Sequence, residues 1–270
     1  AAGTFDMSLL KSELDAVISM QAWSAEEKAL FSDIFVIDID NLDTTSFTKL
    51  VNDVLFAKDM EDVDQDGRQQ FWYFDEAAGT FDMSLLKSEL DAVIYLQNNL
   101  GNDGKEIFEE IFDINIDDLD INTFTSLVND VLFSKNTETG EFWIYDPKTK
   151  SFPEAKLNNF VQTLKRADYL RDQIVANDLE QAFNELYAVQ INFSDLNEKD
   201  FNLLVNLLFN SEGNLKSEKE IDEFLEFLPT VSTIMQAIKN GDISTAAFIN
   251  WTKGRVFEIS SLPSPLSLNP

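Results

Sequence analysis

Apolar residues recur every three or four positions along most of the chain, which is the spacing that places side chains on one face of an α-helix. The pattern occurs in three successive stretches of the chain, and each stretch predicts three short helices. The apolar faces of the first helices are Leu10, Leu14, Val17 and Ile18, then Leu86, Leu90, Val93 and Ile94, then Leu157, Val161 and Leu164. We therefore expect a mainly α-helical protein.

Polar residues that cap helices stand where the predicted helices should begin. Ser24 is followed three residues later by Glu27, which is the spacing of a capping box. Asp43, Asp120 and Asn197 each precede the third helix of a stretch, and side chains of this kind accept hydrogen bonds from the first free backbone N–H groups. These residues fix the starts of the predicted helices.

Aromatic runs between the helical stretches predict β-hairpins. The segments QFWYFDEAAGTFD, at residues 70–82, and EFWIYDPKTKSFP, at residues 141–153, each give an aromatic strand, a turn and a second strand. Gly79 and the pair Asp146-Pro147 are residues suited to those turns. Each hairpin is expected to link one helical stretch to the next.

One sequence, AAGTFDMSLLKSELDAVI, occurs unchanged at residues 1–18 and 77–94, an offset of 76 residues. We expect tandem repeats of about this length, each made of a short β-hairpin and three short helices. The predicted boundaries are residues 1–66, 67–137 and 138–213 for the repeats, 214–253 for a divergent helical part, and 254–270 for a strand-like tail with a Pro-rich end. In the divergent part, separate helices are expected near residues 221–228, 231–239 and 244–252.

The first repeat begins at what should be the second strand of a hairpin, so we expect that strand to lack its partner. GRVFEI, at residues 254–259, resembles GRQQFW, at residues 67–72, in joining Gly-Arg to a β-prone run. The tail could pair with the first strand of the same chain or with that of the next chain, as in strand addition. The expected interface residues are Ala1, Ala2, Gly3, Thr4 and Phe5 on one side and Val256, Phe257 and Ile259 on the other. Two ends without partners are the alternative.

The composition narrows the classes of partner and reaction. With 20 Lys and Arg against 49 Asp and Glu, the net charge is −29, which disfavours nucleic acids and anionic lipid and favours cations. No apolar run is long enough to suggest membrane insertion. The chain has no His and no Cys, so thiol nucleophiles, Ser–His–Asp arrangements and zinc sites of the usual type are excluded. We expect no enzyme. We favour an extracellular or cell-surface location, although no sequence signal specifies one.

DVDQDG, at residues 62–67, has the D-x-D-x-D-G form of a calcium-binding loop. Asp62, Asp64 and Asp66 would supply oxygen ligands to Ca²⁺. The position that would carry a bidentate glutamate in such a loop is Tyr73. An acidic surface turn is the alternative interpretation.

IFDINIDDLDINTF, at residues 111–124, resembles the helix–loop–helix of the EF-hand family. The resemblance implies Asp113, Asn115 and Asp117 as ligands of Ca²⁺. Asp118 stands in place of the family's glycine and Thr123 in place of its bidentate glutamate, so an EF-like shape without the ion is the alternative.

The sequence therefore predicts a non-enzymatic structural protein that self-assembles head to tail into a filament or similar homopolymer, with divalent cations tuning assembly. Two other functions remain open. An EF-hand-like calcium buffer or sensor would follow from the acidic loops. A carbohydrate-binding or carbohydrate-active protein would follow from the aromatic runs that contain Trp72 and Trp143, because aromatic faces stack on sugars, although aromatic residues also favour strands.

Overall fold

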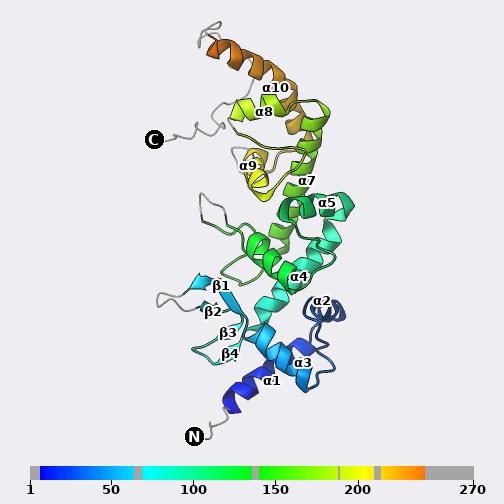
Figure 1. Ribbon diagram of the computed structural model, residues 1–270, viewed down its shortest axis with the longest axis vertical. Coiled ribbons are helices and arrows are strands. Elements are labelled where there is room, and N and C mark those ends of the chain that lie inside the picture. The colour runs from blue at the N-terminus through cyan, green and yellow to red at the C-terminus, as the bar shows by residue number, and fades with distance from the viewer. Residues whose placement is uncertain (1–6, 64–68, 136–139, 188, 210–213, 241–270) are drawn as a thin grey trace. The chain divides into compact units, whose positions relative to one another are not determined.

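The computed structural model describes residues 7–63, 69–135, 140–187, 189–209 and 214–240 (Figure 1). The protein is mainly helical, as the apolar spacing predicts. Its helices are α1 (Met7–Gln21), α2 (Ala25–Phe35), α3 (Thr44–Leu50), η1 (Val51–Leu55), α4 (Met83–Asn99), α5 (Gly101–Phe112), α6 (Ile121–Ser126), η2 (Leu127–Leu132), α7 (Glu154–Ala176), α8 (Glu180–Tyr187), α9 (Glu198–Leu208) and α10 (Glu218–Lys239). None of the helices in these described ranges is both long and apolar enough to span a membrane.

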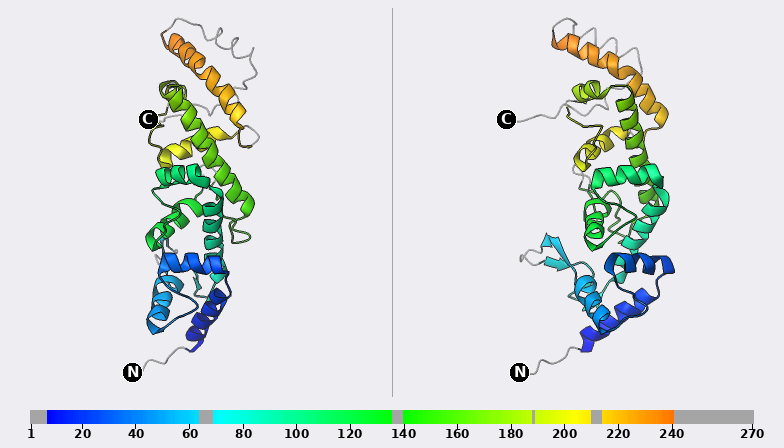
Figure 2. Two further views of the ribbon diagram at one scale, coloured as in Figure 1. Left: turned by 90° about the vertical axis from the view of Figure 1, so that its right-hand side faces the viewer. Right: turned by 45° about the vertical axis from the view of Figure 1, so that its right-hand side comes forward.

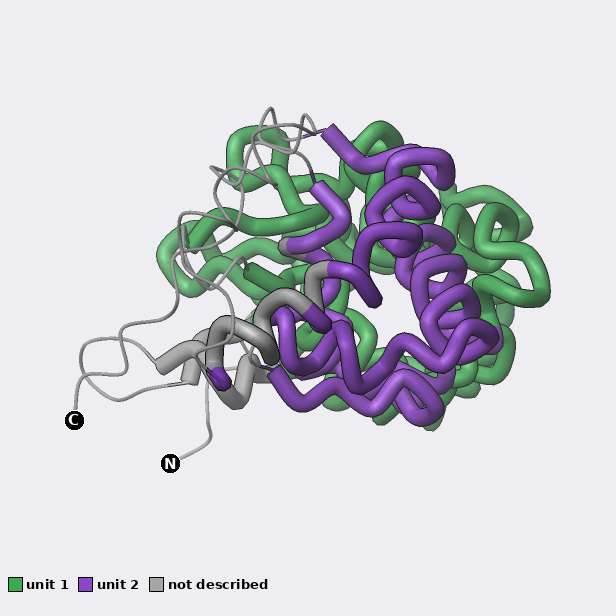
Figure 3. Tube along the Cα trace, turned by 90° about the horizontal axis from the view of Figure 1, so that it is seen from above, with its two compact units in different colours: residues 1–105, 114–161 green, residues 106–113, 162–270 purple. Residues whose placement is uncertain are grey.

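The chain divides into two compact units (Figure 3). Unit 1 comprises Ala1–Lys105 and Ile114–Val161, and unit 2 comprises Glu106–Asp113 and Gln162–Pro270. The boundaries pass through α5 and α7. The repeat boundaries that the sequence predicts, after residues 66, 137 and 213, remain a prediction.

Helix α4 lies in the core of unit 1, where it contacts α1, α2 and η2 (Figure 2). Its residues Leu86, Leu90, Val93 and Leu96 are fully buried. In unit 2, α8 packs against α10, and the ring of Phe183 lies 5.0 Å from that of Phe193 and 6.2 Å from that of Phe224. Burial of these large side chains is the main favourable contribution to the stability of each core.

The predicted helix caps are confirmed. Ser24 and Glu27 form a reciprocal capping box at the start of α2. The side chains of Asp43, Asp120 and Asn197 accept backbone N–H groups at the starts of α3, α6 and α9. These helices begin where they do because the capping side chains satisfy N–H groups that have no partner in the helix.

The third helix of the first two stretches is not α-helical throughout. The same six residues, LVNDVL, occur at residues 50–55 and 127–132. A π-helix forms in each copy, namely η1 in the first and η2 in the second. The N–H group of Phe56 bonds to the carbonyl of Val51 at 3.0 Å, and that of Phe133 to the carbonyl of Val128 at 2.9 Å. The wider turn still leaves the consecutive residues Val54 and Leu55 buried. Apolar spacing alone predicts an ordinary helix here.

The hairpins differ in part from the prediction. Strand β3 (Phe74–Asp75) pairs with β4 (Thr80–Phe81) around Gly79, which has a positive φ of 67°. Phe71, expected in that hairpin, instead ends β2 (Gln69–Phe71) and pairs with Lys58 at the start of β1 (Lys58–Val63). The aromatic run is therefore shared between two hairpins, because the chain turns between Phe71 and Phe74.

The C-terminal part also differs from the prediction. Two helices were expected around residues 221–228 and 231–239, but one helix, α10, runs through Pro229. A proline removes one backbone donor and strains the preceding turn, yet a helix can continue on both sides of it. The helix expected at residues 244–252 lies outside the described residues.

Candidate functional site: the acidic connections between helices

The connection between α2 and α3 is built on an alternation of buried and exposed side chains. Val36 ends α2 with a left-handed backbone conformation, at φ 54°. The next residues alternate, with Ile37 and Ile39 buried and Asp38 and Asp40 exposed. The two isoleucines anchor the connection to the core, so its carboxylates are held on the surface.

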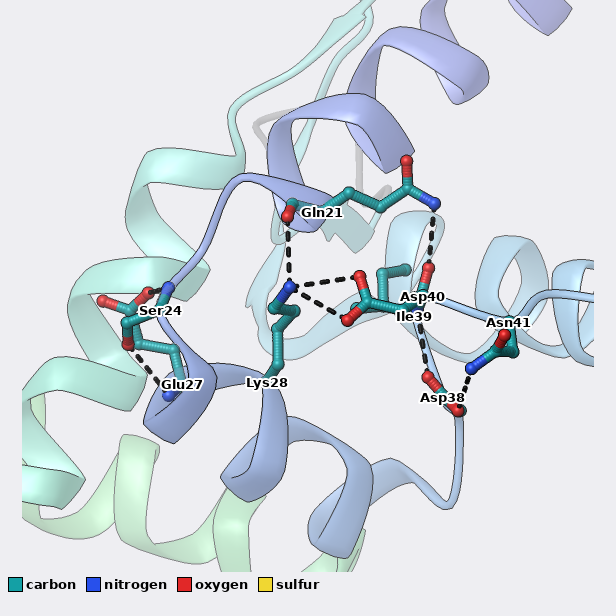
Figure 4. Close-up of polar contacts among 8 residues, drawn as sticks. All are labelled: Gln21, Ser24, Glu27, Lys28, Asp38, Ile39, Asp40 and Asn41. Carbon is teal, nitrogen blue, oxygen red and sulfur yellow. Dashed lines mark hydrogen bonds and ion pairs between the residues drawn. The ribbon is translucent and has the colours of Figure 1, made fainter.

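Asp38 stabilises the turn that follows it (Figure 4). One of its carboxylate oxygens accepts the backbone N–H of Asp40 at 3.0 Å, and the other accepts the side-chain amide of Asn41 at 2.8 Å. The bonds from Asn41 and from the Asp40 backbone hold the pKa of Asp38 below its ordinary value, because they stabilise the charged carboxylate. Its oxygens are thus engaged within the turn itself.

Lys28 joins the connection to the end of α1. Its ammonium group donates to both carboxylate oxygens of Asp40, at 3.1 and 2.9 Å, and to the backbone carbonyl of Gln21 at 3.2 Å (Figure 4). The side-chain amide of Gln21 donates in turn to the carbonyl of Ile39 at 3.1 Å. Lys28 and Gln21 therefore hold the acidic connection against the end of α1 through an ion pair and hydrogen bonds, an arrangement that we call a closed connection.

The same closure recurs in the connection between α5 and α6. Lys105 donates to both carboxylate oxygens of Asp117, at 2.7 and 2.9 Å, and the amide of Gln97 donates to the carbonyl of Ile116 at 2.7 Å. The backbone N–H of Asp117 donates to the side-chain oxygen of Asn115 at 3.0 Å. In unit 2 the corresponding connection is closed differently, by two 2.9 Å hydrogen bonds between the Asn184 side chain and the backbone of Ile191.

These contacts show how the three residues predicted to bind calcium are used. Asp117 faces the Lys105 ammonium, and Asn115 holds the turn around Asp117. Asp113 follows α5 in a left-handed conformation, at φ 55°, and its N–H bonds to the carbonyl of Glu109. Among the described residues, no three acidic side chains are grouped as a metal site would require. Calcium binding at this connection remains a prediction.

The other predicted sites lie mostly beyond the part of the chain that the structure describes. Asp62 belongs to β1, whereas Asp64 and Asp66 are outside the described residues. The predicted assembly interface is also outside them, since it consists of Ala1, Ala2, Gly3, Thr4, Phe5, Val256, Phe257 and Ile259. Strand pairing between these two segments therefore remains a prediction.

The aromatic residues of the hairpins pack largely against one another. The Phe133 ring lies 4.5 Å from that of Tyr145 and 5.3 Å from that of Phe152, and the Trp72 ring lies 6.0 Å from the Phe133 ring. Trp143, by contrast, is 36 % exposed. The ring contacts stabilise the hairpins, and stacking of Trp143 on a ligand remains a prediction.

A buried acidic group on α4 was missed by the sequence analysis. The hydroxyl of Tyr73 donates to one carboxylate oxygen of Glu89 at 2.7 Å, both side chains are buried, and the other oxygen of Glu89 has no hydrogen-bond partner. Burial raises the pKa of Glu89 to about 8, since a charged carboxylate is costly away from water. Glu89 stands three residues after Leu86 and four before Val93, so helical spacing alone could have placed it on the apolar face.

No protein-family model, curated protein sequence or solved structure matches this chain.

Proposed function

We propose that this chain is a non-enzymatic structural protein made of tandem helical repeats, which self-assembles head to tail by pairing its C-terminal strand with the first strand of the next subunit. The repeat proposal rests first on the sequence that is identical at residues 1–18 and 77–94. A repeated helical unit cannot bury its apolar face alone, so neighbouring units must cover one another.

The observation that carries the proposal is the recurrence of one set of contacts. Lys28 with Asp40 and Lys105 with Asp117 are equivalent ion pairs, each beside a glutamine that bonds to the carbonyl of a buried isoleucine. The helices that follow are capped in the same way by Asp43 and Asp120. The recurrence of these contacts supports a repeated structural unit, as expected for a scaffold or filament subunit.

The experiment compares the intact chain with a chain that lacks residues 254–270, using sedimentation velocity at several concentrations. A third chain that lacks only residues 261–270 is the matched control, because it keeps the segment proposed to form the strand. We expect large assemblies from the intact chain and the control, and monomers from the longer deletion. The same sedimentation profile for all three chains would contradict strand pairing.

Cations should influence assembly because the subunit carries a charge of −29. Like-charged subunits repel one another, and salt or divalent cations reduce that repulsion. We expect assembly to increase with added calcium or magnesium and with monovalent salt. Equal responses at equal ionic strength would indicate screening, whereas a response to micromolar calcium would indicate a specific site.

A further inference from the structure

Two helices that share an identical stretch of sequence lie in different surroundings. Residues 7–18 of α1 repeat letter for letter as residues 83–94 of α4. In α4, Met83 is 4 % exposed and Leu90 is 0 % exposed, whereas their counterparts Met7 and Leu14 in α1 are 66 % and 46 % exposed. Because the residues are the same, the difference comes from the neighbouring elements.

Helix α2 covers α4 along one stripe of residues. The carboxylate of Glu27 in α2 forms an ion pair with the ammonium of Lys87, which also bonds to Asp91 at 2.9 Å. One turn further on, Ile94 lines a shared hollow with Leu30 of α2. Lys87, Asp91 and Ile94 are four and three residues apart, so they form a single face of α4 against α2.

The same stripe on α1 is Lys11, Asp15 and Ile18. Lys11 pairs with Asp15 on its own helix, and Ile18 is 64 % exposed. Another side of α1 packs on the hairpin, where the hydroxyl of Ser12 donates to the carbonyl of Gly79 at 2.7 Å. Helix α1 is therefore fixed in unit 1 while it presents the surface that, in α4, lies against α2.

We infer that this face of α1 is a docking site for an amphipathic, acidic helix of the α2 type carried by another polypeptide. The α2 type is defined by the capping pair Ser24 and Glu27 followed by the apolar residues Leu30, Phe31 and Ile34. Its glutamate pairs with Lys11 as Glu27 pairs with Lys87, and its apolar side covers Leu14 and Ile18. The α2–α4 interface is thus the template for the proposed complex.

In the part of the chain that the structure describes, α2 and the helices that follow it at the same place in the later stretches, α5 and α8, are already engaged, so the partner is another polypeptide. Helix α2 covers α4. Helix α5 reaches α7 through Glu110, which pairs with Arg171 at 2.6 Å. Helix α8 packs against α10, with the rings of Tyr187 and Phe224 6.1 Å apart. A second copy of the chain would have to release one of these helices before it could cover α1.

A labelled peptide of residues 22–38 serves as the probe, and its binding to the intact chain is measured by fluorescence anisotropy. We expect saturable binding that Ile18→Asp weakens by about a hundredfold, the scale of losing a central apolar anchor. Lys11→Glu should weaken it by roughly tenfold, the upper end for a partly exposed ion pair. Lys199→Glu reverses the charge of an exposed lysine on α9 and is the matched control for Lys11→Glu.

A charge swap makes the test specific. Peptide carrying Glu27→Lys should bind the unchanged chain weakly and the Lys11→Glu chain more tightly. Absence of binding at millimolar peptide, or equal binding by the Ile18→Asp chain, would overturn the inference. So would self-association of the chain alone that Ile18→Asp removes, since the occupant would then be a second copy. The site uses none of the strand-pairing residues, so either proposal can fail without the other.

Discussion

At the scale of single residues, identical side chains acquire different properties from their surroundings. Glu13 and Glu89 occupy the same place in the repeated sequence. Glu89 is fully buried against Tyr73, whereas Glu13 is partly exposed. Burial raises the pKa of both groups, and only Glu89 reaches a value of about 8. The sequence could not distinguish them, because the difference lies in the neighbours.

Glu89 should make the stability of the protein depend on pH. Its folded-state pKa is raised, so its contribution is complete below the unfolded value near 4.5 and is lost as pH rises through about 8. We expect the free energy of unfolding to fall by up to several kcal/mol across that interval, since one pKa unit corresponds to about 1.4 kcal/mol.

Urea unfolding of Glu89→Gln at a series of pH values checks this. The variant should lack most of the decline, and Glu13→Gln, the matched control, should retain it. Parallel pH profiles for the unchanged chain and Glu89→Gln would show that Glu89 does not titrate in the folded protein over this interval.

At the scale of elements, the sequence predicted best where a local signal decides the structure. Capping side chains such as Ser24 and Asp120 act on their own helix, so the predicted starts of α2 and α6 were confirmed. The π-helices, the β1–β2 hairpin and the continuous α10 were not predicted, because apolar spacing, an aromatic run and a proline do not by themselves fix where a helix widens, where a strand ends or whether a helix continues. The resemblance to the EF-hand family implied Asp113, Asn115 and Asp117 as calcium ligands, and it does not reveal that a lysine twelve residues away pairs with Asp117.

The cap of α6 offers a direct test at this scale. Asp120→Ala should lower the free energy of unfolding, because two backbone N–H groups lose their acceptor. The pKa of Asp120 is lowered by its bonds with the Thr123 backbone and hydroxyl, so the contribution is present above the unfolded pKa and is lost as pH falls through the folded value. Thermal unfolding at pH 7 and pH 3 measures both effects.

Asp118→Ala is the control for that experiment. Asp118 is exposed in the same connection and is not the cap. An equal loss of stability in the two variants would contradict a specific role of Asp120 as a cap.

Lys105 provides a test of the closed connection. Lys105→Met removes the ammonium from Asp117 and should lower stability by up to about 1 kcal/mol, as for other partly exposed ion pairs. It also leaves the Asp117 carboxylate free, so any calcium affinity of this connection should increase. Calorimetric titration with calcium measures that change, and an unchanged or lower affinity would count against Asp117 as a ligand.

At the scale of the whole molecule, the net charge of −29 governs how stability depends on salt. Self-repulsion destabilises a compact acidic chain at low ionic strength, and added salt screens it. We expect the midpoint of thermal unfolding to rise as sodium chloride increases from about 10 mM to about 500 mM, where the Debye length falls from about 30 Å to a few Å. A midpoint that falls with salt would mean that attractive ion pairs dominate instead.

The central claim is self-assembly, and electron microscopy of the intact, purified chain in negative stain tests it most directly. Samples with calcium and with a chelator are compared at the same protein concentration and ionic strength. The account predicts filaments or other regular polymers, more abundant with calcium. Uniform single particles of the size of one 30.7 kDa chain under both conditions would contradict it.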